Sequence, residues 1–301
     1  KGTVIQPKAA ANRAHAEHGL AMSIEVSDGE DSHLYLLDTG GMGNTIVHNA
    51  KQFGVDLGDV EKIILSHGHF DHFGGLTDVL PEVKENCEFY LSPNCYSQNY
   101  VALTKTGEEV PPEELPTAIR KSKERFKINN KLPPFSKRLL TKLGDPKDIK
   151  IIETDEPMEL HEGIMTSGQI ELFDPSEVTA GFYIMKGRKE FKKHTFRDET
   201  SLYFNVEGKG LVVITGCGHC GIVNTIKHGQ QLTGMDKVHA VIGGFHEEWN
   251  PVEVIEKKVD FLENLDPDII CGMHCTGFPF NKMMSEHPAH ALGVVGTEFR
   301  F

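Results

Sequence analysis

The chain has 301 residues, of which 39% are hydrophobic and 25% are charged, and its formal net charge is −13. This composition supplies a proper core and excludes a disordered chain, and the length suits one large domain or two modest ones. The negative charge argues against nucleic-acid binding through a broad basic surface, and no apolar run is long enough to span a membrane.

Short apolar runs alternate with helical patterns along the chain, which is typical of an α/β fold with its chemistry at strand ends. The expected helices cover residues 45–53, 74–80, 221–232 and 251–264. The expected strands cover residues 33–38, 61–65, 88–91, 150–153, 181–185, 201–206, 211–215, 239–243 and 268–272.

The first strand ends at Asp38, which is followed by Thr39 and Gly40. A carboxylate at this position can orient a ligand histidine through the free ring N–H. The alternative is an Asx turn. The glycine-rich piece 40–44 opens the helix 45–53 and is a candidate phosphate site at the helix N-terminus, but it lacks the lysine of a P-loop.

The run His67-Gly68-His69-Phe70-Asp71-His72 follows an apolar strand and precedes Gly74-Gly75. The extended strand end directs His67 and His69 to one side, and the turn brings Asp71 and His72 toward the same pocket. Neutral imidazoles suit zinc, iron or manganese, and a carboxylate adds charge neutralisation. The run therefore predicts a metalloenzyme with two divalent ions, for which we expect zinc, with iron and manganese as alternatives.

The stretch 96–148 differs from its surroundings, with two Pro-Pro pairs, many Lys and Glu residues, and a helical pattern only around 113–126. We interpret it as an insertion near the active site that shapes substrate access, within a single domain covering 1–301. A surface excursion without a role in binding is the alternative.

Three further histidines, His219, His246 and His274, stand just past apolar strands. His219 belongs to Gly216-Cys217-Gly218-His219, where glycines let the backbone pass close to an ion. We expect His219 and His274 to be metal ligands and His246 to be catalytic. A lone histidine after a strand is otherwise more often a hydrogen-bonded structural residue.

The six cysteines show no dense disulfide framework, so we expect reduced thiols and a cytoplasmic protein. Cys217-x2-Cys220 and Cys271-x3-Cys275 have spacings that a structural zinc site accepts. Buried thiols packed under the turns are the favoured interpretation, except for Cys217, which we expect to face the metals. Because the chain begins at Lys1 rather than Met, we also expect an upstream segment.

The histidine motif, the early Asp38-Thr39-Gly40 and the late strand-end histidines together resemble the metallo-β-lactamase superfamily over nearly the whole chain. Residues 17–20, 215–224, 243–246 and 274–277 are similar to the branch labelled 7,8-dihydropterin-6-methyl-4-(β-D-ribofuranosyl)aminobenzene 5′-phosphate synthase-like. The resemblance implies an αββα sandwich, two mixed β-sheets flanked by helices, with one or two metals at the sheet edge activating water.

The resemblance also implies a division of ligands between two metals. One metal takes His67, His69 and His219, and the other takes Asp71, His72 and His274. The chain departs from the family pattern at two places. Residues 166–169 stand where a mid-chain His is expected, and Cys217 stands where an Asp would bridge the metals. This leaves two alternatives: hydroxide alone links the ions, or one metal site is weak. The strand before Glu17 is abbreviated.

The mechanism we expect is hydrolysis of an ester, lactone, amide or phosphate bond by a metal-bound hydroxide, since a catalytic ion lowers the pKa of water to about 7. The second ion would stabilise the oxyanion. Asp71 doubles as ligand and proton acceptor, and His18, His246 and Asp198 are candidates for substrate contact or proton transfer. For Asp198 a plain surface turn is the alternative.

Three other functions remain open. The first is a transferase that binds a pterin with a phosphorylated sugar under the 96–148 insertion. The second is redox chemistry at a di-iron centre, for which the chain is too short to carry a flavin domain, and the third is metal binding without turnover. We expect a small-molecule substrate, no nucleic acid and no membrane, with a homo-oligomer left open.

Overall fold

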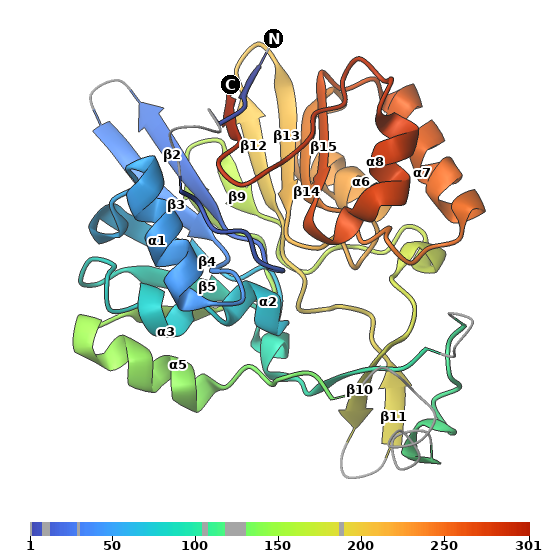
Figure 1. Cartoon of the computed structure of the whole chain (residues 1–301), viewed down its shortest axis with the longest axis horizontal. Helices are drawn as coiled ribbons and strands as arrows, with labels where there is room; N and C mark the ends of the chain where they lie inside the picture. The colour runs from blue at the N-terminus through green and yellow to red at the C-terminus, as the bar shows by residue number, and fades with distance from the viewer. Residues whose placement is uncertain (1, 8–12, 29–30, 104–107, 118–130, 187–189) are drawn as a thin grey trace.

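The computed structural model describes residues 2–7, 13–28, 31–103, 108–117, 131–186 and 190–301. Two β-sheets face each other and helices cover their outer faces, with α1, α3 and α5 on one side and α6, α7 and α8 on the other (Figure 1). The mixed α/β sandwich predicted from the sequence is therefore confirmed. The two chain ends lie side by side, because β1 (Thr3–Ile5) pairs with β16 (Glu298–Arg300).

The first sheet has five strands in the order β2-β3-β4-β5-β7, and only β2 runs antiparallel to its neighbour. Residues alternate between its two faces: Leu36 and Ile63 pack toward the helices, whereas Leu37 and Ile64 pack toward the second sheet. The strands are β2 (Met22–Asp28), β3 (Asp31–Leu37), β4 (Val60–Ile64), β5 (Glu88–Leu91) and β7 (Lys150–Glu153). The helices on this side are α1 (Gly43–Phe53), α2 (Phe70–Phe73), α3 (Leu76–Val79) and α5 (Lys137–Gly144).

The second sheet has six strands in the order β15-β14-β13-β12-β9-β8, with β13, β14 and β15 parallel. Val213 and Val241 pack under the helices, and Val212 and Ala240 pack against the first sheet. The strands are β8 (Glu159–His161), β9 (Ile164–Thr166), β12 (Leu202–Val206), β13 (Gly210–Thr215), β14 (Val238–Gly244) and β15 (Ile269–Met273). The helices are α6 (Ile222–Thr233), α7 (Val252–Leu265) and α8 (Gly277–Met284).

A small sheet of β6 (Asn99–Val101), β10 (Phe182–Lys186) and β11 (Glu190–Lys193) lies apart from the sandwich, with its hairpin pointing away (Figure 1). The stretch 96–148 is therefore not self-contained, because its strand β6 pairs with β10 from much later in the chain. At its other end, α5 packs into the core beneath the first sheet. Most of the helical pattern expected at 113–126 lies outside the described residues.

The expected strands are all present within a few residues, and so are the helices 45–53, 221–232 and 251–264. The helix expected at 74–80 is shorter, because α3 covers only Leu76–Val79 after a separate α2. The described residues also form short 3-10 helices, which are η1 (Leu57–Asp59), η2 (Pro93–Tyr96), η3 (Asp145–Lys147), η4 (Pro175–Glu177) and η5 (His274–Thr276). Within the described ranges, every helix lacks the length and apolarity needed to cross a membrane.

Candidate metal centre

The loop after β4 carries the histidine run into the space between the two sheets. A Cβ on Gly68 would lie 2.3 Å from the carbonyl oxygen of Cys95, so only glycine lets this loop pack down. Gly216, after β13, is similarly constrained, since a Cβ there would lie 2.2 Å from Ser66 Oγ. The first approach packs the loop after β4 against η2, and the second brings that loop together with the loop after β13.

His67, His69 and His219 form one compact group, whose ligand atoms all lie within 4.8 Å of one another. His69 Nδ1 lies 3.2 Å from His219 Nε2, and His67 Nε2 is buried without a hydrogen-bond partner. Burial lowers the pKa of His69 to about 3 and holds the pKa values of His67 and His219 well below their usual range. The rings are therefore neutral, as metal ligands must be, and the orphaned nitrogen fits a divalent ion.

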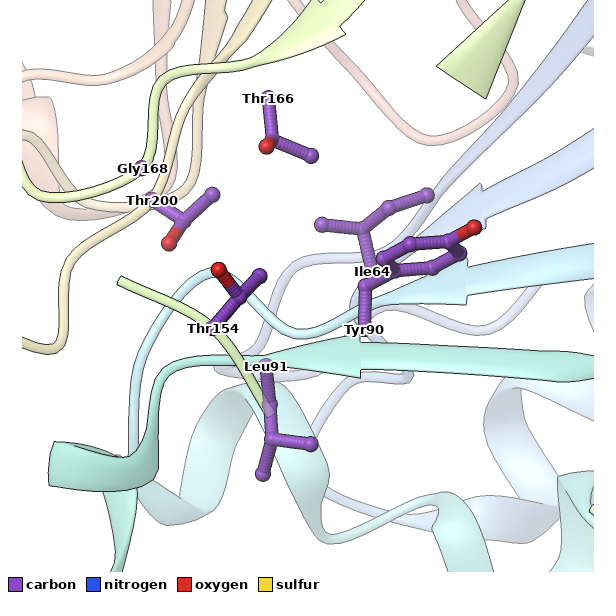
Figure 2. A pocket seen from close by; sticks show the side chains of 7 residues that line it. All are labelled: Ile64, Tyr90, Leu91, Thr154, Thr166, Gly168 and Thr200. Atoms are coloured by element: carbon purple, nitrogen blue, oxygen red, sulfur yellow. The ribbon is translucent and has the colours of Figure 1, made fainter. Parts of the chain in front are cut away.

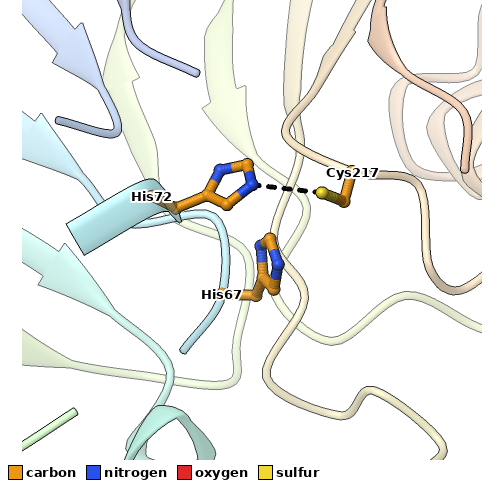
Figure 3. A group of neighbouring side chains, drawn as sticks. All are labelled: His67, His72 and Cys217. Atoms are coloured by element: carbon orange, nitrogen blue, oxygen red, sulfur yellow. Dashed lines mark hydrogen bonds between the residues drawn. The ribbon is translucent and has the colours of Figure 1, made fainter. Parts of the chain in front are cut away.

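His72 and Cys217 form a second group with His67 (Figure 3). His72 Nε2 lies 3.1 Å from Cys217 Sγ, so the thiol faces the imidazoles. Cys217 also forms a candidate ligand group with His274 and Cys275. The Cys275 thiol donates to the Cys217 carbonyl oxygen at 3.4 Å. The thiol of Cys217 thus lies among side chains of three candidate ligand types: imidazole, thiol and, beyond His72, carboxylate.

The other members of the two cysteine pairs lie elsewhere. Cys220 packs among aromatic and aliphatic side chains that include Phe196, and Cys271 packs between the two sheets. All six cysteines are free and buried. In the part of the chain that the structure describes, the four cysteines of the two spaced motifs do not converge on one zinc site.

Asp71 faces the solvent side of the cluster. Its Oδ2 lies 3.3 Å from His18 Nε2, 3.2 Å from His274 Nε2 and 3.9 Å from His72 Nε2. Burial raises the pKa of Asp71, but the hydrogen bonds from His18 and His274 outweigh it, so the pKa lies below its usual range. The His18 side chain is 68% exposed, which makes this the open side of the centre.

Asp38 orients His72 from the buried side. Its Oδ2 accepts from His72 Nδ1 at 2.6 Å and from the Ser66 hydroxyl at 2.7 Å, and its Oδ1 accepts from the Ser66 backbone N–H at 2.7 Å. These contacts are long-range in sequence rather than a local Asx turn. Burial lowers the pKa of His72, but the Asp38 charge and hydrogen bond raise it above its usual value. With Nδ1 engaged, Nε2 faces Cys217.

Asp198 does not lie in a surface turn, because it is 1% exposed. Its Oδ2 accepts from the backbone N–H of Gly68 at 3.0 Å, between His67 and His69. The neighbouring Glu199 was not predicted from the sequence. Its carboxyl group accepts from the backbone N–H groups of His219 and Cys220, in the loop after β13. The only sequence signal was two adjacent acids just before a strand.

His246 lies beside the first group, with its ring 4.3 Å from the His219 ring and 5.6 Å from Phe182 of β10. It has a left-handed backbone, with φ of 53°. Burial lowers its pKa to about 4. Among the described residues His246 is in none of the candidate ligand groups, so it borders the centre.

The glycine-rich piece 40–44, a candidate phosphate site, already holds a carboxylate of the chain itself. Glu17 Oε1 accepts from the backbone N–H groups of Gly41 and Met42 at 2.9 and 3.2 Å. A carboxylate of the chain itself therefore occupies the position that a phosphate would take.

Residues 166–169 border a cavity of about 10 Å³ between the sheets (Figure 2). Its volume is roughly that needed for one water molecule. The segment supplies hydroxyl and backbone groups rather than an imidazole, so His219 is the third histidine of the first group. The cavity is lined by Ile64, Tyr90, Leu91, Thr154, Thr166, Gly168 and Thr200.

The lowered pKa of His246 predicts a pH-dependent stability difference. On unfolding between about pH 6.5 and 4, wild-type His246 takes up a proton that the folded state excludes, so its contribution to stability falls as pH falls. The free energy of unfolding of wild type minus that of His246→Gln should decrease by about 1.4 kcal/mol for each pH unit that the pH falls in that window. Urea unfolding of both metal-free proteins from pH 7.5 to 4.5 measures this, and a constant difference would contradict the buried neutral ring.

The fold and the cluster define a class: an α/β sandwich with a candidate metal centre at the strand ends. Residues 22–84 match the family model of the metallo-β-lactamase superfamily. A Methanocaldococcus jannaschii protein named 7,8-dihydropterin-6-methyl-4-(β-D-ribofuranosyl)-aminobenzene-5′-phosphate synthase is 30% identical over 277 residues, covering 90% of this chain and 85% of that protein. The chain belongs to the metallo-β-lactamase superfamily, in agreement with the resemblance of its motifs.

Two other proteins are similar over almost their full length. An uncharacterized M. jannaschii protein is 26% identical over 293 residues and covers 97% of both chains. A crystal structure described as a metal-dependent hydrolase of the β-lactamase superfamily superposes with a TM-score of 0.69 at 22% identity, covering 95% of this chain and 92% of that one. The superposition bears on the fold alone.

Proposed function

We propose that the chain is a metal-dependent hydrolase that cleaves an ester, lactone, amide or phosphate bond in a small molecule. The observation that carries the proposal is the convergence of four overlapping ligand groups at one sheet edge, with buried neutral imidazoles on one side and an open carboxylate on the other. We assign His67, His69 and His219 to one divalent ion and Asp71, His72 and His274 to the other. Zinc is the ion we expect, with iron and manganese as alternatives.

Bound divalent ions supply Lewis-acid activation of water and of a substrate oxygen. The chain's own residues then handle orientation and protons. Asp38 holds His72 in one tautomer, and Cys217 contributes a sulfur where the family pattern has a carboxylate. This arrangement supports a centre that is built before substrate arrives.

We place proton transfer on the solvent-exposed side of the centre, where Asp71 and His18 lie. The hydrogen bond with Asp71 raises the pKa of His18 above its usual value, although partial burial opposes it. His18 is exposed and Asp71 is partly buried, so the pair connects the cluster to solvent. We assign Asp71 as ligand and proton acceptor, His18 as the group that exchanges the proton with solvent, and His246 as a substrate contact.

A synthase is the second candidate, because the relative that is 30% identical is named a synthase. In that case the same centre would organise transfer of a 6-methyldihydropterin group from a leaving group to a ribofuranosylaminobenzene 5′-phosphate, so that the new bond forms as the bond to the leaving group breaks. Phe182 of β10, stacked on His69 with ring centroids 5.2 Å apart, places a buried aromatic ring next to the centre.

One experiment separates the two functions. The metal-loaded protein is incubated in ¹⁸O water with a phosphodiester, a phosphomonoester, a lactone and a β-lactam. Separately, it is incubated with a 6-methyldihydropterin that carries a leaving group and with ribofuranosylaminobenzene 5′-phosphate. Hydrolysis predicts one ¹⁸O atom in a product and loss of turnover after chelation. A coupled pterin product without ¹⁸O would favour the synthase, and neither product with metal bound would contradict both enzymatic proposals.

A further inference from the structure

The segment 196–200 joins β11 to β12 and lies between the two loops of the first histidine group. We call it the bridging segment. It contacts the loop after β4, which carries His67 and His69, and the loop after β13, which carries His219. These contacts do not involve the open side of the centre.

At the loop after β4, the bridging segment binds backbone groups on both sides of His67. Asp198 Oδ2 accepts from the Gly68 N–H at 3.0 Å, and the Thr200 N–H donates to the Ser66 carbonyl oxygen at 2.7 Å. Both bonds are buried, since Asp198 is 1% exposed and Ser66 fully buried. The backbone that carries His67 is therefore fixed before and after the residue.

At the loop after β13, Glu199 binds two consecutive backbone groups. Its Oε1 accepts from the His219 N–H at 2.7 Å and its Oε2 from the Cys220 N–H at 2.5 Å, and the side chain is fully buried. The Phe196 ring stacks on the His219 ring, with centroids 4.1 Å apart and planes 2° apart. The bridging segment thus fixes both the backbone and the ring plane of His219.

The bridging segment adopts a costly conformation to make these contacts. Phe196 has φ of 47°, which a bulky residue rarely adopts. Its N–H donates to His194 Nδ1 at 2.7 Å, and its carbonyl oxygen accepts from the Glu199 N–H at 2.9 Å. Burying the adjacent carboxyl groups of Asp198 and Glu199 costs further free energy, which hydrogen bonds to their oxygen atoms offset.

We propose that Asp198 and Glu199 are positioning residues that hold the loop of His67 and His69 and the loop of His219 at the separation required by a metal ion, before the ion binds. This inference rests on the proposed metal centre. Groups that act on ligands from outside the coordination sphere change metal affinity by roughly 10–100-fold when they are removed. Because the two carboxyl groups bind backbone groups next to His67, His69 and His219, their loss should weaken that site more than the Asp71, His72 and His274 site.

The test is Glu199→Gln, which keeps the shape but replaces one acceptor oxygen by an NH₂ group facing a backbone N–H. Cobalt(II) and zinc titrations against a chromophoric chelator measure each binding step. The variant His69→Ala identifies the step at the first group, and His274→Ala identifies the step at the Asp71, His72 and His274 site. We expect a roughly 10–100-fold weaker first-group step and a changed visible cobalt spectrum. Asp198→Asn, which still offers an amide oxygen to Gly68, should show a smaller effect in the same step.

The matched control is Asp268→Asn, which replaces the carboxylate 2.8 Å from His239 Nδ1 by a neutral amide where β14 and β15 begin, at the end of the sheet opposite the centre. Its metal affinities should equal those of wild type. Unchanged affinity in Glu199→Gln, or equal weakening of both steps, would overturn the positioning role. Wild-type protein that binds no metal would instead overturn the proposed function, and this inference with it.

Discussion

Replacing His69 by alanine should lower metal affinity at the first group at least about 100-fold and reduce turnover by at least a similar factor. Loss of a ligand exceeds the 10–100-fold effect of losing a group outside the coordination sphere. His69 is 5% exposed, and its Nδ1 lies 3.2 Å from His219 Nε2, so a deletion leaves two imidazoles where three converge. Elemental analysis of the purified variant and chelator competition measure the loss.

The control for this variant is His48→Ala on α1. His48 Nε2 bonds the Arg13 carbonyl oxygen at 2.7 Å, far in sequence from the histidine run. Its removal should leave metal content and turnover at the wild-type level. Full metal content and turnover in His69→Ala would contradict the ligand assignment.

Replacing Asp38 by alanine should destabilise the protein by about 3–5 kcal/mol, because it breaks a buried charged network. Asp38 and His72 are fully buried, and the Asp38 carboxylate is the shared acceptor for His72 and for two donors of Ser66. Without it, His72 loses the partner that raises its pKa, and the Ser66 N–H loses its acceptor. Denaturant unfolding of the metal-free protein measures the change.

The companion variant Asp38→Asn should lose less stability, since its amide oxygen still accepts from Ser66. Asp268→Ala is a second comparison: its carboxylate is 35% exposed and contacts one buried partner, His239, so its loss should cost less than that of Asp38. A change below about 1 kcal/mol for Asp38→Ala would show that the network does not stabilise the fold.

The central strands were predictable because each is a run of apolar residues that ends at glycine or a polar group. β4, β13, β14 and β15 follow this pattern and carry the site at their ends. The three-residue strands β6 and β9 are too short to show a periodicity, and each is fixed by its partner strand. α5 was missed because its Lys- and Arg-rich sequence resembles the rest of the stretch 96–148.

The side chains that face the centre were largely predictable, since imidazole and carboxylate groups at strand ends indicate metal chemistry directly. The residues around them were not. Ser66 and Glu199 act on backbone groups or on another carboxylate, and such partners leave no spacing in the sequence. The position of Asp198 beneath Gly68 likewise depends on a contact between residues 130 positions apart.

The most direct test of the account is the metal content of wild-type protein, purified without added metal and then titrated with zinc, iron(II) and manganese. The account predicts two divalent ions per chain, with the first-group step abolished in His69→Ala and the second abolished in His274→Ala. Protein that retains no metal and binds none at micromolar concentration would contradict the central claim that the clustered histidines form a metal centre.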